Sequence, residues 1–276
     1  MRSTLFRDAF RCLPWTSEEV SALNLDTSFR LYQEAFSSPA SFKFFFVGDL
    51  TPEQVEGLAR KYLGALPAGG SSRSWVDTGV RALTGNHDSE LRTGREPRSR
   101  VEIVYSGPLP WSLDNLARLE ALAQVLESRL RGAIRREAGG SYDVAIADQI
   151  TIVPDQEYYL YESFSCAPDR AAELARIARA ETQRLCDQGA DPDVVSAVRQ
   201  MLRKDHEQDV RTNEFWLTAL QTAEANGIDL MSLRQFDARM ASITVERVSA
   251  DARHLLRPDN VLQVIQYPEL PAGAPG

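Results

Sequence analysis

The chain has 276 residues, of which 43% are hydrophobic and 25% charged, as expected of a globular protein with one large or two smaller domains. Its net charge of -8, without a basic stripe along the sequence, excludes nucleic acid and anionic membranes as expected partners. No apolar run approaches the ~18 residues of a transmembrane helix, so no membrane span is predicted.

The first 67 residues are predicted to contain two helices with a buried strand between them. Residues 16–19 (TSEE) have the form of a capping box, and helical spacing through residues 27–36 places aromatic side chains on one face. Residues 42–47 (FKFFFV) are dense in aromatic side chains, which is typical of a buried strand. Residues 51–63 begin with Thr-Pro, a cap and a first-turn proline, and are predicted to form the second helix.

Residues 68–99 differ in character from the segments on either side. Gly, Ser, Arg and Thr dominate, and the apolar residues show little periodicity. This stretch is therefore predicted to be a linker, with a short edge strand near residues 75–83.

From residue 100 onwards, strand and helix patterns follow one another. Alternating apolar and polar residues predict strands at residues 101–106 and 261–267 and a hairpin over residues 144–164. An apolar stripe over residues 113–134 predicts a long helix. The order of elements indicates the α+β class, a ferredoxin-like mixed or antiparallel sheet with helices packed on one face. Further helices are predicted for residues 168–186, 192–210, 213–226, 230–242 and 244–257.

A helix, a proline and an apolar strand occur in the same order twice. Pro39 and Pro258, which separate helix from strand in the two copies, are 219 positions apart (258 − 39). Such an interval suggests a repeated domain. Residues 1–67 are then the tail of a preceding homologous domain that begins before Met1, residues 68–99 a linker, and residues 100–276 a complete domain. The chain is thus expected to be a fragment or to pair with a separate subunit; alternatively, residues 42–47 join the second domain's sheet.

The sequence carries no recognisable catalytic or metal-binding motif. The three histidines, His87, His206 and His254, do not occur in HExxH or HxxEH, the spacings that place two zinc ligands and a base on one helical face. A nucleophile elbow, a P-loop and GxGxxG are also missing from the sequence. We therefore predict no catalytic residue and no metal ligand in this chain.

Cysteines and the first residues give little further information. Cys12, Cys166 and Cys186 are far apart in the sequence and are predicted to be free thiols. No apolar segment of a signal peptide follows Met1. Neither feature assigns the protein to a compartment.

Residues 128–142 (SRLRGAIRREAGGSY) are the part of the chain on which the functional prediction depends. They end the long helix, turn through two glycines and enter a strand, so Arg135 lies on the last helical turn and Tyr142 at the start of the strand. We interpret this pair as substrate-binding residues. Arg136 is a competing candidate, and the alternative is that Arg135 is a surface charge and Tyr142 a core residue.

Four segments of the chain resemble the pitrilysin/insulinase (inverzincin) family of zinc metallopeptidases, in particular bacterial members built from tandem homologous domains. These segments are FRLYQEAFSSPASFKFFFVGDLTPEQVEGLARKYLGALP, RVEIVYSGPLPW, LESRLRGAIRREAGGSYDV and RPDNVLQVIQYPE. Family members are clamshells whose N-terminal half carries HxxEH and zinc, while the C-terminal half lacks zinc. That second half contributes an Arg and a Tyr seven positions apart, a spacing that Arg135 and Tyr142 match. The resemblance implies that the pair hydrogen-bonds the peptide backbone near the scissile bond.

The expected function is therefore that of the non-catalytic C-terminal part of a zinc metallopeptidase, which closes the chamber and binds peptide substrate. Its partner would be an HxxEH-bearing half, in cis or as a separate subunit, and zinc would lie on that half. An inactive binding or assembly subunit without proteolysis is the alternative. An unrelated stand-alone enzyme has no motif in its favour. By resemblance alone, a periplasmic location is implied.

Overall fold

The computed structural model describes residues 2–39, 42–66, 74–138 and 143–269. The chain forms two compact units, which are described separately. The first unit comprises Met1–Cys12, Val80–Lys204 and Phe236–Gly276, and the second comprises Leu13–Gly79 and Asp205–Gln235. In the described residues, no helix is both long enough and apolar enough to cross a membrane.

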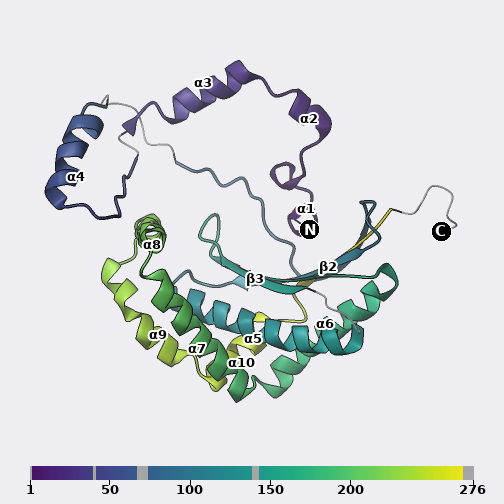
Figure 1. Ribbon diagram of the computed structural model, residues 1–276. Coiled ribbons are helices and arrows are strands. Elements are labelled where there is room, and N and C mark those ends of the chain that lie inside the picture. The colour runs from purple at the N-terminus through teal and green to yellow at the C-terminus, as the bar shows by residue number, and fades with distance from the viewer. Residues whose placement is uncertain (1, 40–41, 67–73, 139–142, 270–276) are drawn as a thin grey trace. The chain divides into compact units, whose positions relative to one another are not determined.

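A five-stranded mixed sheet forms the centre of the first unit (Figure 1). Its order is β1-β5-β2-β4-β3, with β1 parallel to β5 and every other neighbouring pair antiparallel. The predicted hairpin is confirmed as β3 and β4, and the sheet agrees with the predicted α+β class. The strands are β1 (Asn86–Arg92), β2 (Ser99–Pro108), β3 (Val144–Ile150), β4 (Glu157–Cys166) and β5 (Val261–Tyr267).

The long helices of the first unit cover one face of this sheet (Figure 1). The stripe that predicts α5 is the face that this helix buries, including Leu119, Leu126 and Ile134. Burial of each such side chain stabilises the fold by about 1.5–3 kcal/mol. The helices of this unit are α5 (Leu113–Ala138), α6 (Ala171–Gln188), α7 (Pro192–Asp209, whose last residues belong to the second unit), α9 (Phe236–Ser242) and α10 (Val245–Leu255), with a 3-10 turn at Pro168–Arg170.

The opposite face of the sheet has a smaller apolar cluster. Leu5 of α1 (Arg2–Leu5) is buried there against Val104, Leu262 and Val264 of the sheet. The carbonyl oxygen of Leu5 also accepts a hydrogen bond from the backbone N–H of Leu83 at 2.8 Å. These contacts attach the start of the chain to the first unit; a 3-10 turn at Phe10–Cys12 follows.

The second unit consists of short helices that contain few buried side chains. The capping boxes predicted at Thr16 and Thr51 are confirmed, since each threonine accepts the N–H of the residue three positions on and that residue's side chain bonds back. The helices are α2 (Ser17–Ser21), α3 (Leu25–Ala35), α4 (Pro52–Leu58, continued by a π-helical turn at Ala59–Leu63) and α8 (Asn213–Asn226), with a 3-10 segment at Leu230–Gln235.

Two predicted strands are wrong. Residues 42–47 do not form a strand, because a strand requires a hydrogen-bonded neighbour and no described strand pairs with this segment. Residues 75–83 are irregular, and the strand in this region, β1, lies at Asn86–Arg92. Its position is set by parallel pairing with β5, for example Ser89 opposite Val264, a contact that local sequence does not reveal.

Candidate functional site

Arg135 lies on the last turn of α5, as predicted, and its side chain is exposed. Tyr142, the other predicted substrate-binding residue, and the glycines at 139 and 140 lie outside the described residues. The site is therefore described around Arg135 alone.

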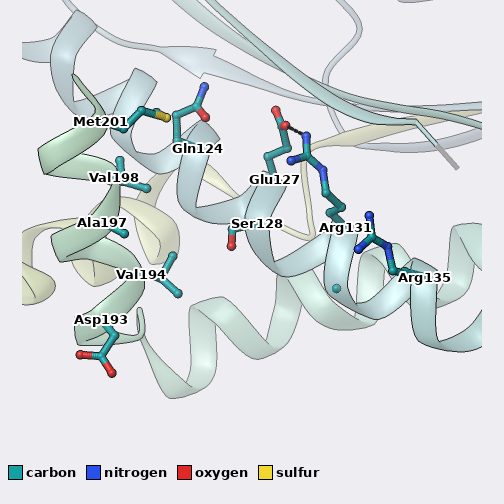
Figure 2. Close-up of a pocket in the computed structure, with 11 residues that line it drawn as sticks. Gln124, Glu127, Ser128, Arg131, Arg135, Asp193, Val194, Ala197, Val198 and Met201 are labelled. Atoms are coloured by element: carbon teal, nitrogen blue, oxygen red, sulfur yellow. Dashed lines mark hydrogen bonds and ion pairs between the residues drawn. The ribbon is translucent and has the colours of Figure 1, made fainter. Parts of the chain in front are cut away.

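A groove of about 720 Å³ lies between α5 and α7, and Arg135 is one of its lining residues (Figure 2). The α5 residues recur at steps of one, three or four positions, so they form one stripe along that helix. Arg136 is exposed but does not line the groove. The lining comprises Gln124, Glu127, Ser128, Arg131, Gly132 and Arg135 from α5, and Asp193, Val194, Ala197, Val198 and Met201 from α7.

The two arginines of the groove differ in their partners. Arg131 forms an ion pair with Glu127 one turn earlier on α5. The other carboxylate oxygen of Glu127 accepts the backbone N–H of Ile146 on β3 at 3.4 Å. Within the described part of the chain, Arg135 makes no ion pair or hydrogen bond. Its five N–H donors are therefore available to an acceptor on a ligand.

The wall contributed by α7 is mainly apolar (Figure 2). Val198 is almost fully buried, while Ala197 and Met201 remain exposed to the groove. The α7 side of this groove was not predicted from the sequence. A usable signal was present, since residues 194, 197, 198 and 201 recur at helical i, i+3, i+4, i+7 spacing.

The histidines are not gathered into a metal site in the described residues. His87 lies on β1, and its Nε2 is 2.9 Å from the carbonyl oxygen of Thr84. The ring of His206 lies edge-on to Phe215, with 5.4 Å between ring centroids. Across residues 2–39, 42–66, 74–138 and 143–269, no three His, Cys, Asp or Glu side chains are close enough together to hold a metal ion. The described donors therefore do not fit a zinc ion.

Comparison with known proteins gives one family match and several partial relatives. The family described as "Peptidase M16 inactive domain" matches residues 26–202. A protein of Haemophilus influenzae named "Probable zinc protease PqqL" is 26% identical over 198 residues, which is 70% of this chain and 20% of that protein. The chain therefore spans about a fifth of the length of this relative.

Solved structures share the fold at lower sequence identity. The ferredoxin protease FusC, in complex with Arabidopsis ferredoxin, has a TM-score of 0.79 and 19% identity over 97% of this chain and 29% of its own. The first half of the periplasmic protease PqqL from Escherichia coli has a TM-score of 0.70 and 16% identity over 90% of this chain and 56% of its own. At these identities, the similarity establishes the fold.

Proposed function

This chain belongs to the peptidase M16 family, as its inactive domain, and on that premise we propose that it binds peptide substrate for a zinc-bearing catalytic half, in cis or as a separate subunit. This agrees with the resemblance of four sequence segments to the pitrilysin/insulinase family of zinc metallopeptidases. The single observation that carries the proposal is the exposed Arg135, which lines a groove and has no partner among the described residues.

The proposed chemistry of Arg135 is hydrogen bonding to a backbone carbonyl of the substrate. A guanidinium is planar and always charged, so it can offer two parallel donors without a change in its protonation state. Tyr142 would add a rigid phenolic donor. Binding of this kind contributes to catalysis by holding the peptide in a reactive geometry.

We further propose that residues 1–67, of which the first twelve pack with the first unit, are the tail of a preceding homologous domain. The support comes from the internal repeat. In its first copy, the side chains of Phe29 and Phe36 in the α3 region are 56% and 57% exposed. Their counterparts 219 positions later, Val248 and Leu255, are buried on α10. A domain that provides the equivalents of α5, α6 and β2 would bury the exposed aromatic side chains in the same way.

The test combines the chain with an HxxEH-bearing half, in cis or in trans, and measures peptide cleavage. Arg135→Ala should lower kcat/KM by about 10-fold or more, because one charge-assisted hydrogen bond is lost. Tyr142→Phe should also lower it. Arg136→Ala is the matched control, one residue away and outside the groove, and should cleave as the wild type does.

Two results would reject the assigned role. The first is wild-type cleavage by both the Arg135 and the Tyr142 variants. The second is a loss of cleavage that follows Arg136 instead. Peptide binding without any turnover would favour the alternative function, a binding or assembly subunit.

A further inference from the structure

The groove beside Arg135 has a chemical character that bears on which peptides it accepts. We propose that it binds a large apolar side chain of the same peptide whose backbone Arg135 holds. This inference rests on the proposed function and adds the substrate class to it. The groove is thus a specificity pocket built from α5 and α7.

The apolar wall is the first support. Val194, Ala197 and Met201 of α7 face the groove and are incompletely covered by the rest of the chain. Covering such surface with an apolar group is favourable because it removes apolar area from water. A leucine or phenylalanine side chain would therefore be held more tightly than a glycine, which covers none of this surface.

Gly132 is the second support, because it keeps the α5 side of the groove open. A glycine inside a helix is destabilising relative to alanine, so its presence within α5 is unfavourable for the helix itself. A Cβ atom at this position would lie 3.4 Å from a terminal nitrogen of Arg136, the far end of a flexible side chain. Close packing therefore does not require a glycine at this position, whereas the absence of a side chain there keeps the groove open.

The charges around the groove argue against an acidic side chain as the occupant. Arg131 is already paired with Glu127, and Asp193 adds a second carboxylate to the lining. With Arg131 and Glu127 paired, Asp193 and Arg135 leave the lining without net charge, so an acidic side chain gains no net attraction there. An acceptor without net charge, such as a backbone carbonyl, suits Arg135 better.

The experiment uses the full chain and fluorescein-labelled peptides that differ only in one residue, Gly, Leu, Phe or Glu. Fluorescence anisotropy should give about 10- to 100-fold tighter binding for Leu and Phe than for Gly or Glu. Ala197→Phe fills the groove and should remove most of this preference. Gln200→Phe, an exposed α7 position that does not line the groove, is the control and should retain it. Circular dichroism checks that each variant is folded.

The outcomes separate this inference from the proposed function. Equal affinity for Gly and Leu peptides, or an unchanged preference in the Ala197 variant, would overturn the specificity pocket while leaving peptide binding intact. If Arg135→Ala binds every peptide as the wild type does, or if no peptide binds, both the proposed function and the specificity pocket are rejected. If Ala197→Phe instead disrupts a dimer seen by sedimentation, the groove is an interface between copies and the inference is wrong.

Discussion

The hydroxyl group of Thr182 on α6 donates a hydrogen bond to the carboxyl group of Glu162 on β4, with 2.8 Å between Oγ1 and Oε1. Glu162 is completely buried, and its second oxygen has no hydrogen-bond partner in the described structure. Burial raises the pKa of Glu162 to about 8, against the lowering effects of Thr182 and Arg179. The carboxyl group is therefore mostly protonated at neutral pH.

The first prediction is that the first unit loses stability as the pH rises from about 5 to 8. The folded pKa of Glu162, about 8, is higher than the value of about 4.3 for an unfolded chain. The stabilisation from protonated Glu162 is present in full below the pKa of the unfolded chain. It is lost as the pH rises through the pKa of the folded protein, by at most about 1.4 kcal/mol per pH unit. Urea unfolding at several pH values measures this slope.

Glu162→Gln isolates the contribution of this carboxyl group, because glutamine has nearly the same shape and does not titrate. The slope between pH 5.5 and 7.5 should be less negative in this variant than in the wild type. The exposed Glu207→Gln serves as the control and should keep the wild-type slope. Identical slopes for wild type and Glu162→Gln would show that the buried carboxyl group does not govern the pH dependence.

The burial of Glu162 could have been read from the sequence, whereas other features could not. In β4, Leu160 and Phe164 face the core, and the period of two in a strand places Glu162 on the same face. Helix boundaries were also predictable, because caps such as Thr51 and first-turn prolines act within a few residues. Local chemistry and periodicity thus account for the helices and for the hairpin.

Long-range pairing accounts for the errors. β1 has the polar sequence NHDSELR and forms a strand only because β5, some 175 residues later, pairs with it. Conversely, residues 42–47 have a strongly apolar sequence but no partner strand among the described residues. The groove between α5 and α7 is likewise a product of tertiary packing, since its two walls are about sixty residues apart in sequence.

The second prediction concerns the ion pair between Arg118 on α5 and Asp251 on α10. Asp251 is buried, and the arginine Nε is 3.0 Å from Oδ2, with a second contact from Nη2 to Oδ1. Arg118→Ala should lower the free energy of unfolding by about 3 kcal/mol, because it leaves a buried carboxylate unpaired. Urea unfolding measures the loss, and Asp251→Asn in the same chain should restore part of it. Equal losses in the single and double variants would contradict this account.

The third prediction concerns thiol reactivity. Cys166 and Cys186 are buried, and burial raises the pKa of each to about 11, so few thiolates form at pH 8. Cys12 is only partly buried. A thiol reagent such as DTNB should therefore label Cys12 rapidly and the other two only on unfolding. Cys12→Ser should abolish the rapid phase; its persistence in that variant would place an accessible thiol in the sheet or in α6.

The fourth prediction tests the exposed stripe of Phe29, Tyr32 and Phe36, of which each side chain is more than half exposed. Neighbouring rings of this stripe contact one another, with 4.6 Å between the centroids of Tyr32 and Phe36. Serine at all three positions should reduce binding of the dye ANS and any concentration-dependent association. Stability of the first unit should change by less than about 0.5 kcal/mol, because exposed side chains contribute little to folding.

Gln33→Ser is the matched control for this stripe, because it changes an exposed polar residue of the same helix. It should leave dye binding and association unchanged, since the apolar area is intact. Dye binding that is equal in the triple variant and the wild type would mean that the stripe is already covered in solution. In that case the aromatic residues would not be available to a preceding domain, and the proposal that residues 1–67 complete such a domain would have to be abandoned.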